Sequence, residues 1–156
     1  MRVADVFSTI FNAAVNYFRA PIGTFHWLTF EVSSAQVRTY RDFQRETKAR
    51  YATHDLVNRT SVIEYLGREP DVITFTMNFN SRLGVKPSEE ISQLRYLCQE
   101  HIADQLILGN KVCGDNLWVI ESISEEVEAT DHFGQVIAAS AKVTMREYVA
   151  RIENDV

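Results

Sequence analysis

Histidine is the side chain best suited to acid–base or metal chemistry near neutral pH, and this 156-residue chain contains four of them. No pair has the H-x-x-x-H or H-E-x-x-H spacing that places two metal ligands on one helix face. His54 and Asp55 are neighbours on a predicted strand, so their side chains point to opposite faces and make a poor acid–base pair. The sequence therefore predicts no metal site. The four residues are His26, His54, His101 and His132.

The two cysteines, Cys98 and Cys113, have neither C-x-x-C nor zinc-type spacing. They are expected to be reduced thiols that behave as small apolar side chains, which fits a reducing compartment. The chain also lacks a G-x-S-x-G motif, a P-loop and a G-x-G-x-x-G motif. We therefore predict no enzymatic activity, no catalytic residue and no cofactor. A small enzyme that uses either cysteine with a histidine stays open as an alternative.

The composition is that of a folded domain. Hydrophobic residues make up 46%, charged residues 24% and aromatic residues 11% of the chain. The length is typical of one domain, and we find no internal repeat or interdomain linker. No apolar run is long enough to cross a bilayer, and polar residues interrupt any signal-peptide core near the N-terminus. The net charge of −5 makes the chain a poor candidate for holding duplex DNA by phosphate neutralisation alone.

Residues 1–20 are predicted to form an amphipathic helical extension, because apolar residues recur there every three or four positions. Pro21 and Gly23 then end the helix. Its polar face has a single arginine, whereas a membrane-surface helix prefers several basic residues. The helix either caps its own domain or docks on a neighbouring subunit. The apolar stripe consists of Val3, Val6, Phe7, Ile10, Phe11, Ala14 and Phe18.

Strand patterns fill most of the remaining sequence, and one further helix is predicted among them. Strands are predicted at residues 25–32, 37–43, 50–56, 61–66 and 71–80, then at 105–108, 111–113, 117–124 and 136–149. The helix begins at Pro87, which suits a first helical turn, and runs to Ile102. A hairpin loop at Asp131–Gly134 separates the last two strands. This order predicts an α+β fold with antiparallel strands and one helix packed against the sheet.

Alternation predicts which faces of these elements are buried. Ile73, Phe75, Met77 and Phe79 lie on one side of their strand, and we expect the apolar stripe of the helix to pack on them. The same period in the last strand puts Val143, Met145 and Glu147 on one face and Lys142, Thr144 and Arg146 on the other. The helix stripe consists of Ile91, Leu94, Leu97, Cys98 and Ile102.

Two charge clusters also stand out. A basic one comprises Arg38, Arg41, Arg45, Lys48, Arg50 and Arg59, and an acidic one comprises Glu121, Glu125, Glu126, Glu128 and Asp131. They are either two solvated faces or complementary edges of neighbouring subunits in a ring, since head-to-tail contacts that close produce rings. A nucleic-acid-binding role for the basic cluster stays open, although no RNP-like or helix-turn-helix pattern supports it.

A series of short motifs resembles the phage tail protein U (GpU-like) family. The central one runs from Asp71-Val72-Ile73-Thr74-Phe75 to the segment Leu83-Gly84-Val85-Lys86-Pro87-Ser88-Glu89-Glu90-Ile91. Flanking segments occur in the same order, and the match extends from about Ile22 to Val149. They are Ile22–Phe25, Ala49–His54, Ile63–Gly67, Leu106–Lys111, Trp118–Ile120 and Val143–Val149. Each motif is weak alone, but the ordered set is specific.

The resemblance implies a structural virion protein of a contractile phage tail or tail-like particle, of the kind called a ripcord. It implies a baseplate component close to the tube and hub, with an antiparallel β-barrel or sandwich of the tail-tube type and one flanking helix. Implied partners are a LysM-containing baseplate protein and the hub, tube and wedge subunits, within a ring-forming homo-oligomer for which a hexamer is favoured. Assembly is expected in the host cytoplasm, without a membrane or specific nucleic-acid binding. A tail-tube end or tail-terminator ring is the alternative.

The predicted organisation is an N-terminal extension at 1–20, a GpU-like tail domain at 21–150 and a short tail at 151–156. The long N-terminal helix departs from the family pattern. The resemblance brings no catalytic, cofactor-binding or metal-binding residue. The subunit contacts that we predict from the apolar stripe and the two charge clusters are Val3, Phe7, Ile10, Phe11, Phe18, Arg41, Arg45, Arg50, Glu125 and Glu128.

Overall fold

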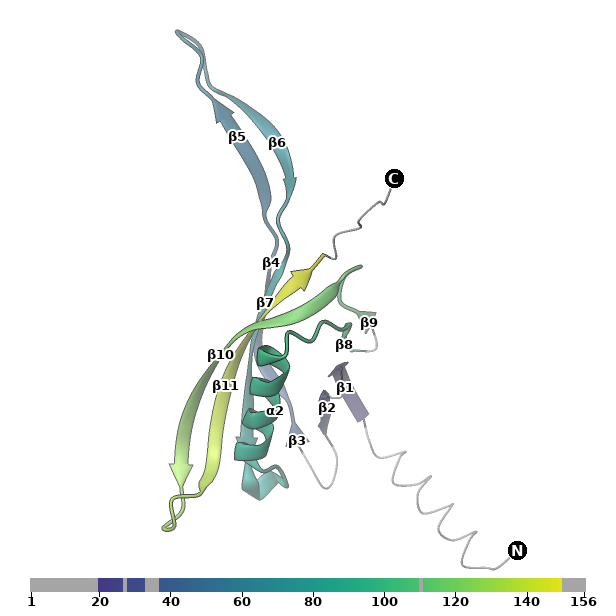
Figure 1. The fold of residues 1–156 in the computed structure, drawn as a ribbon, viewed down its shortest axis with the longest axis vertical. Helices are drawn as coiled ribbons and strands as arrows, with labels where there is room; N and C mark the ends of the chain where they lie inside the picture. Colours follow the sequence, from purple (N-terminus) through teal and green to yellow (C-terminus); the bar gives the residue numbers. More distant parts are fainter. Residues whose placement is uncertain (1–19, 27, 33–36, 110, 150–156) are drawn as a thin grey trace, which may run out of the picture.

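The computed structural model describes residues 20–26, 28–32, 37–109 and 111–149 of the chain. Three antiparallel sheets and one α-helix are spread along an elongated molecule (Figure 1). The strands are β1 (Ala20–Phe25), β2 (Leu28–Val32), β3 (Val37–Arg38), β4 (Tyr40–Glu46), β5 (Ala49–His54), β6 (Val62–Arg68), β7 (Val72–Asn80), β8 (Leu106–Leu108), β9 (Lys111–Val112), β10 (Leu117–Thr130) and β11 (Val136–Tyr148). The helices are the 3₁₀ turn η1 (Ser81–Leu83) and α2 (Pro87–Gln99).

The four-stranded sheet, in the order β10-β11-β7-β4, supplies most of the core. The predicted alternation in β7 is confirmed, because Ile73, Phe75, Met77 and Phe79 are all buried. The neighbouring β11 buries Val143 and Met145 in register with Phe75 and Ile73. Two adjacent apolar rows of period two therefore form one continuous face of the sheet.

Helix α2 covers that face. Pro87 occupies its first turn and Glu89 and Glu90 follow there, where the helix dipole favours anions. The helix buries Leu94 and Leu97 completely and packs mainly on β10 and β11, with less contact to β7 (Figure 1). The helix and β7 thus share one core, as predicted, although the helix lies over the last hairpin rather than centrally over β7.

The five-stranded sheet, in the order β3-β2-β1-β8-β9, contributes Phe25, Leu28 and Leu106 to the core. Its β1–β8 pairing depends on Gly23, because a Cβ atom there would stand 2.3 Å from the Ile107 carbonyl oxygen. The segment 25–32, predicted as one strand, is divided into β1 and β2. His26 has a left-handed φ of 53° at that point, and the two strands pair with each other as a hairpin.

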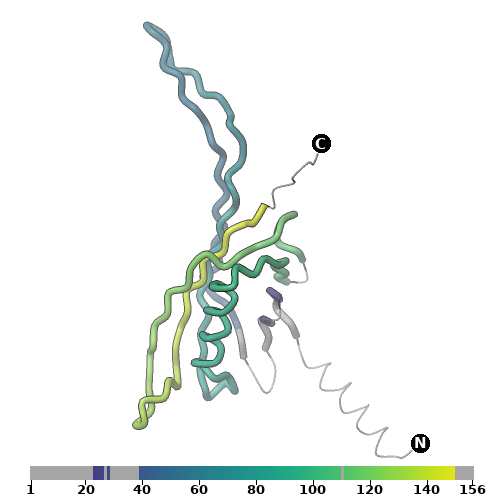
Figure 2. Tube along the Cα trace, in the orientation of Figure 1, coloured from purple at the N-terminus to yellow at the C-terminus, as the bar shows by residue number. Residues whose placement is uncertain are grey.

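The third sheet contains only β5 and β6, which project from the body as a long hairpin (Figures 1 and 2). We call residues 49–68 the arm. The arm continues from β4 on one side and enters β7 on the other, so its base lies at one end of the four-stranded sheet. The β10–β11 turn lies at the opposite end of the long axis.

The α+β class with antiparallel strands and one packed helix is confirmed, whereas a closed barrel is not found among the described residues. The four-stranded sheet ends at β10 and β4, and β5 pairs only with β6, so the predicted strands do not join into one closed ladder. The predicted N-terminal helix lies outside the described residues. Within the described part of the chain, no helix is long and apolar enough to span a membrane.

Candidate assembly interface

The arm carries nearly half of the exposed large hydrophobic residues on the described part of the chain. One face is set by the β5–β6 register, which pairs Tyr51 with Tyr65 and Thr53 with Ile63. Tyr51, Ile63 and Tyr65 are 56%, 65% and 61% exposed. Seven of the fifteen exposed large hydrophobic residues lie on the arm: Tyr51, Leu56, Val57, Val62, Ile63, Tyr65 and Leu66. Apolar patches of this kind mark interaction sites in soluble proteins.

Cross-strand contacts hold the arm's own shape. The Tyr51 and Tyr65 rings meet edge to face with centroids 5.6 Å apart. On the other face His54 Nε2 lies 3.0 Å from Glu64 Oε2. Beyond it, the Ser61 hydroxyl donates to Asp55 at 2.7 Å and ties the two sides of the tip. These contacts set the pairing register, but all of them are exposed, so they stabilise the arm only modestly.

A buried polar cluster anchors the base of the arm. Glu147 on β11 accepts from the Arg68 guanidinium at 2.5 Å, the Asn116 amide at 2.8 Å and the Asp71 backbone N–H at 3.1 Å. Arg45 Nε donates to Asp71 Oδ2 at 2.8 Å. Glu147 and Asp71 are both almost fully buried, which requires that their charges be paired. We call Arg45, Arg68, Asp71, Asn116 and Glu147 the root cluster.

The root cluster fixes both strands that lead into the arm. Arg45 lies at the end of β4 and Arg68 at the end of β6, and both bond carboxylates held by the body. The Arg45 guanidinium also lies 5.7 Å from the centre of the buried Trp118 ring, a cation–π distance. Burial raises the pKa of the Glu147 carboxyl, but hydrogen bonds from Asn116, the Asp71 N–H and Arg68 lower that pKa by more, so the net shift is downward.

The far end of the β10–β11 hairpin is acidic. Residues 125–141 contain four acids and no lysine or arginine; we call this segment the acidic end. The Asp131 carboxylate is already hydrogen-bonded within the turn, because it accepts from the Phe133 and Gln135 backbone N–H groups. Glu125 bonds Arg95 of α2 through both carboxylate oxygens at 2.5 Å. Glu126 and Glu128 are exposed.

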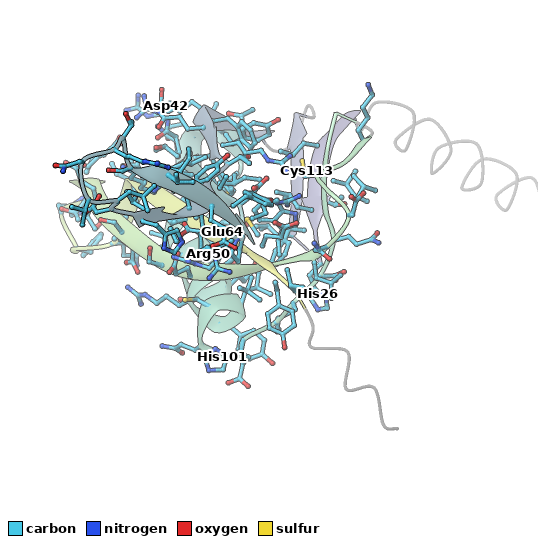
Figure 3. The ribbon with its side chains drawn as sticks, turned by 90° about the horizontal axis from the view of Figure 1, so that it is seen from above. His26, Asp42, Arg50, Glu64, His101 and Cys113 are labelled. Carbon is cyan, nitrogen blue, oxygen red and sulfur yellow. The ribbon has the colours of Figure 1, made fainter. Side chains whose placement is uncertain are left out.

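The cysteines and histidines form no reactive pair that the described residues reveal. Burial raises the pKa of the Cys113 thiol against the opposing charge of Arg45, which disfavours the thiolate that a nucleophile needs. Cys113 and His101 lie well apart in Figure 3. Cys98 donates weakly to the Glu121 carbonyl at 3.9 Å. Among the described residues no three His, Cys, Asp or Glu side chains gather as a metal site.

The predicted subunit contacts fall into three groups. The five apolar residues of the N-terminal stripe, Val3 to Phe18, lie outside the described residues. Arg41, Arg50 and Glu128 are exposed on the surface. Arg45 and Glu125 already have partners within the chain, namely Asp71 and Arg95.

The sequence did carry one signal for the root cluster. Alternation put Glu147 on the same face as Val143 and Met145, and a carboxylate on a buried row must find a partner. Arg68, Asp71 and Asn116 could not be assigned as those partners, because they lie 31–79 positions away along the chain.

Residues 28–150 match the phage P2 GpU family, which is most of the chain. The chain belongs to the GpU family of phage tail proteins. The ordered motifs between Ile22 and Val149 had indicated the same family. Membership makes this GpU-family chain a structural protein of the tail of a virion-type particle. A search of curated protein sequences found no match.

Two solved structures are distantly similar to this chain. One is the tail of an empty gene transfer agent particle with C6 symmetry, with a TM-score of 0.42 and 14% identity over 83% of this chain and 92% of that one. The other is the virion of a native gene transfer agent particle, with a TM-score of 0.41, the same identity and the same coverage. Because both TM-scores are below 0.5, these structures do not bear on the function of this chain.

Proposed function

We propose that this GpU-family protein is a baseplate component of a contractile tail, where it links the tube and hub to the surrounding baseplate proteins. The observation that carries the proposal is the arm, an apolar hairpin that extends beyond the folded body and has no cover within the described part of the chain. A subunit that must hold a neighbour needs such a surface, whereas a catalytic role would need a pocket with converging polar groups.

The proposed mechanism is mechanical. The root cluster would hold the arm at a fixed direction relative to the four-stranded sheet, so that force on the arm is transmitted to the body through ion pairs with the buried carboxylates of Asp71 and Glu147. The chain would form a ring, for which six copies are favoured, and would contact a LysM-containing protein and the hub, tube and wedge subunits. It would shift or release when the tail contracts.

Several residues are proposed as contacts in that assembly. Arg41, Arg50 and Glu128 have exposed side chains that a neighbour can reach. The apolar N-terminal stripe would add a further contact, either to a neighbouring subunit or to the domain itself. Arg45 and Glu125 would contribute to assembly by holding the arm and α2 in place, because their carboxylate and guanidinium partners are internal.

The test is incorporation into particles. Ile63→Ser and Tyr65→Ser together remove apolar surface from the arm without touching the core. The matched control is Tyr96→Ser with Val112→Ser, which removes exposed apolar side chains elsewhere on the body. We expect the arm variant to be folded but absent from purified tails, and the control to be incorporated. Normal incorporation and contraction with the arm variant would overturn the proposal.

A gold label on the C-terminus separates the baseplate from the alternative site. Label at the baseplate end of the tail is expected. Label at the opposite end would instead identify a tail-terminator ring.

A further inference from the structure

The arm and the acidic end have matching chemistry. The arm and the adjoining Lys48 together contain four basic residues and two acidic ones, in a chain whose net charge is −5. Lys48 bonds Glu46 at 2.8 Å and Arg68 belongs to the root cluster. That leaves Arg50 and Arg59, for which the described residues offer no acidic partner. Arg50 lies near the base of the arm, where it pairs with Gly67, and Arg59 lies in the tip beyond the end of β5.

The acidic end has the opposite sign and its own apolar surface. Glu126 and Glu128 have no basic partner among the described residues, and no lysine or arginine occurs between positions 125 and 141. Phe133 in the adjoining turn is 78% exposed, and Val127, on the opposite face of β10 from the two glutamates, is 54% exposed. Apolar contact surrounded by opposite charges is the pattern of a specific protein interface.

The two surfaces lie at opposite ends of the long axis of the molecule (Figure 1), so they cannot meet within one copy. We propose that the arm of one copy docks on the acidic end of a second copy, with Arg59 at the tip of the arm facing Glu126 and Glu128 and with Arg50, nearer the base, adding attraction at longer range. This contact is head-to-tail, so each copy donates an arm and receives one, and repetition gives a closed ring or a stack. The inference deepens the proposed function, because it names the partner of the arm.

The experiment uses two charge-reversed full-length chains. The arm variant carries Arg50→Glu and Arg59→Glu, and the acceptor variant carries Glu126→Arg and Glu128→Arg. All four side chains are exposed, so neither variant disturbs the core. The control, Gln99→Arg with Glu100→Arg, adds three units of positive charge at exposed sites at the end of α2, away from both surfaces. Sedimentation velocity over a concentration series measures association, and circular dichroism verifies folding.

We expect the wild-type chain and the control to associate. Each variant alone should associate at least about tenfold more weakly, because the charges that attract each other in the wild type become repulsive. An equimolar mixture of the two variants should recover wild-type association. In that mixture the negative arm meets a positive acceptor, and the positive arm meets a negative one.

Three results would overturn the inference. If the acceptor variant alone associates like wild type, the arm does not use the acidic end. If the mixture fails to recover association, the two surfaces do not face each other. If the wild-type chain stays monomeric at every concentration while tails still incorporate it, the arm binds a different tail protein, and the proposed function stands without this contact.

Discussion

Replacing Glu147 by alanine should destabilise the domain far more than the same change at Glu125. Both glutamates bond an arginine at 2.5 Å, but they differ in burial. Glu147 also accepts from Asn116 and the Asp71 N–H, so truncation leaves an amide, a backbone N–H and the Arg68 guanidinium without their acceptor. Loss of one partner from a buried ion pair costs about 3–5 kcal/mol. Because Arg68 is half exposed, we expect a loss at the low end of that range, about 3 kcal/mol.

Glu125→Ala removes an ion pair with Arg95 at a half-exposed guanidinium, for which about 0–1 kcal/mol is expected. Urea denaturation of the two variants and the wild type gives both free energies of unfolding. Equal losses, or a loss below about 1 kcal/mol for Glu147→Ala, would refute the conclusion that the root cluster anchors the arm.

Four further outcomes are expected. The difference in unfolding free energy between wild type and Glu147→Gln should be constant above the ordinary glutamate pKa of 4.5 and should shrink as the pH falls through the lowered folded-state pKa of Glu147. Urea titrations at several pH values measure this difference, and a difference that grows in acid would contradict the downward shift of the pKa. Phe75→Ala should cost about 3–5 kcal/mol and Thr76→Ala on the opposite face less than about 1 kcal/mol, so similar denaturation midpoints would mean that the faces are wrongly assigned. Gly23→Ala should open the β1–β8 pairing, so amide exchange in β8 should be faster than in the wild type while exchange in β7 is unchanged; an unchanged rate in β8 would show that the pairing accommodates the added methyl group. A chain that begins at Pro21 should sediment as a smaller species than the full chain if the N-terminal helix is an assembly element, whereas identical behaviour would show that it is not.

Period-two alternation was enough to predict β7 and β11 and to place Glu147 on the same face as Val143 and Met145, because one face of each strand lies on the core. It also predicted strands at 50–56 and 61–66 with a turn between them. It could not show that these strands leave the body, since alternation reports strand geometry and not which sheet a strand joins. The barrel or sandwich of the tail-tube type was expected from family resemblance and not from any pattern in these residues.

The charge clusters show the same limit. The charged residues of each cluster can be identified from the sequence, but the partner of each charge depends on which residues the fold brings together. Arg45 meets Asp71 because β4 and β7 are neighbours, and Glu125 meets Arg95 because α2 lies over β10. Arg50 and Glu128 remain at the surface, where the contacts proposed with a second copy would use their charges.

A cryo-EM map of the intact particle tests the central claim most directly. We expect a ring of this chain at the baseplate end of the tail, with Tyr51, Ile63 and Tyr65 of every arm buried against a neighbouring subunit. A ring at the other end of the tail, or arms that extend into solvent in the assembled particle, would contradict it.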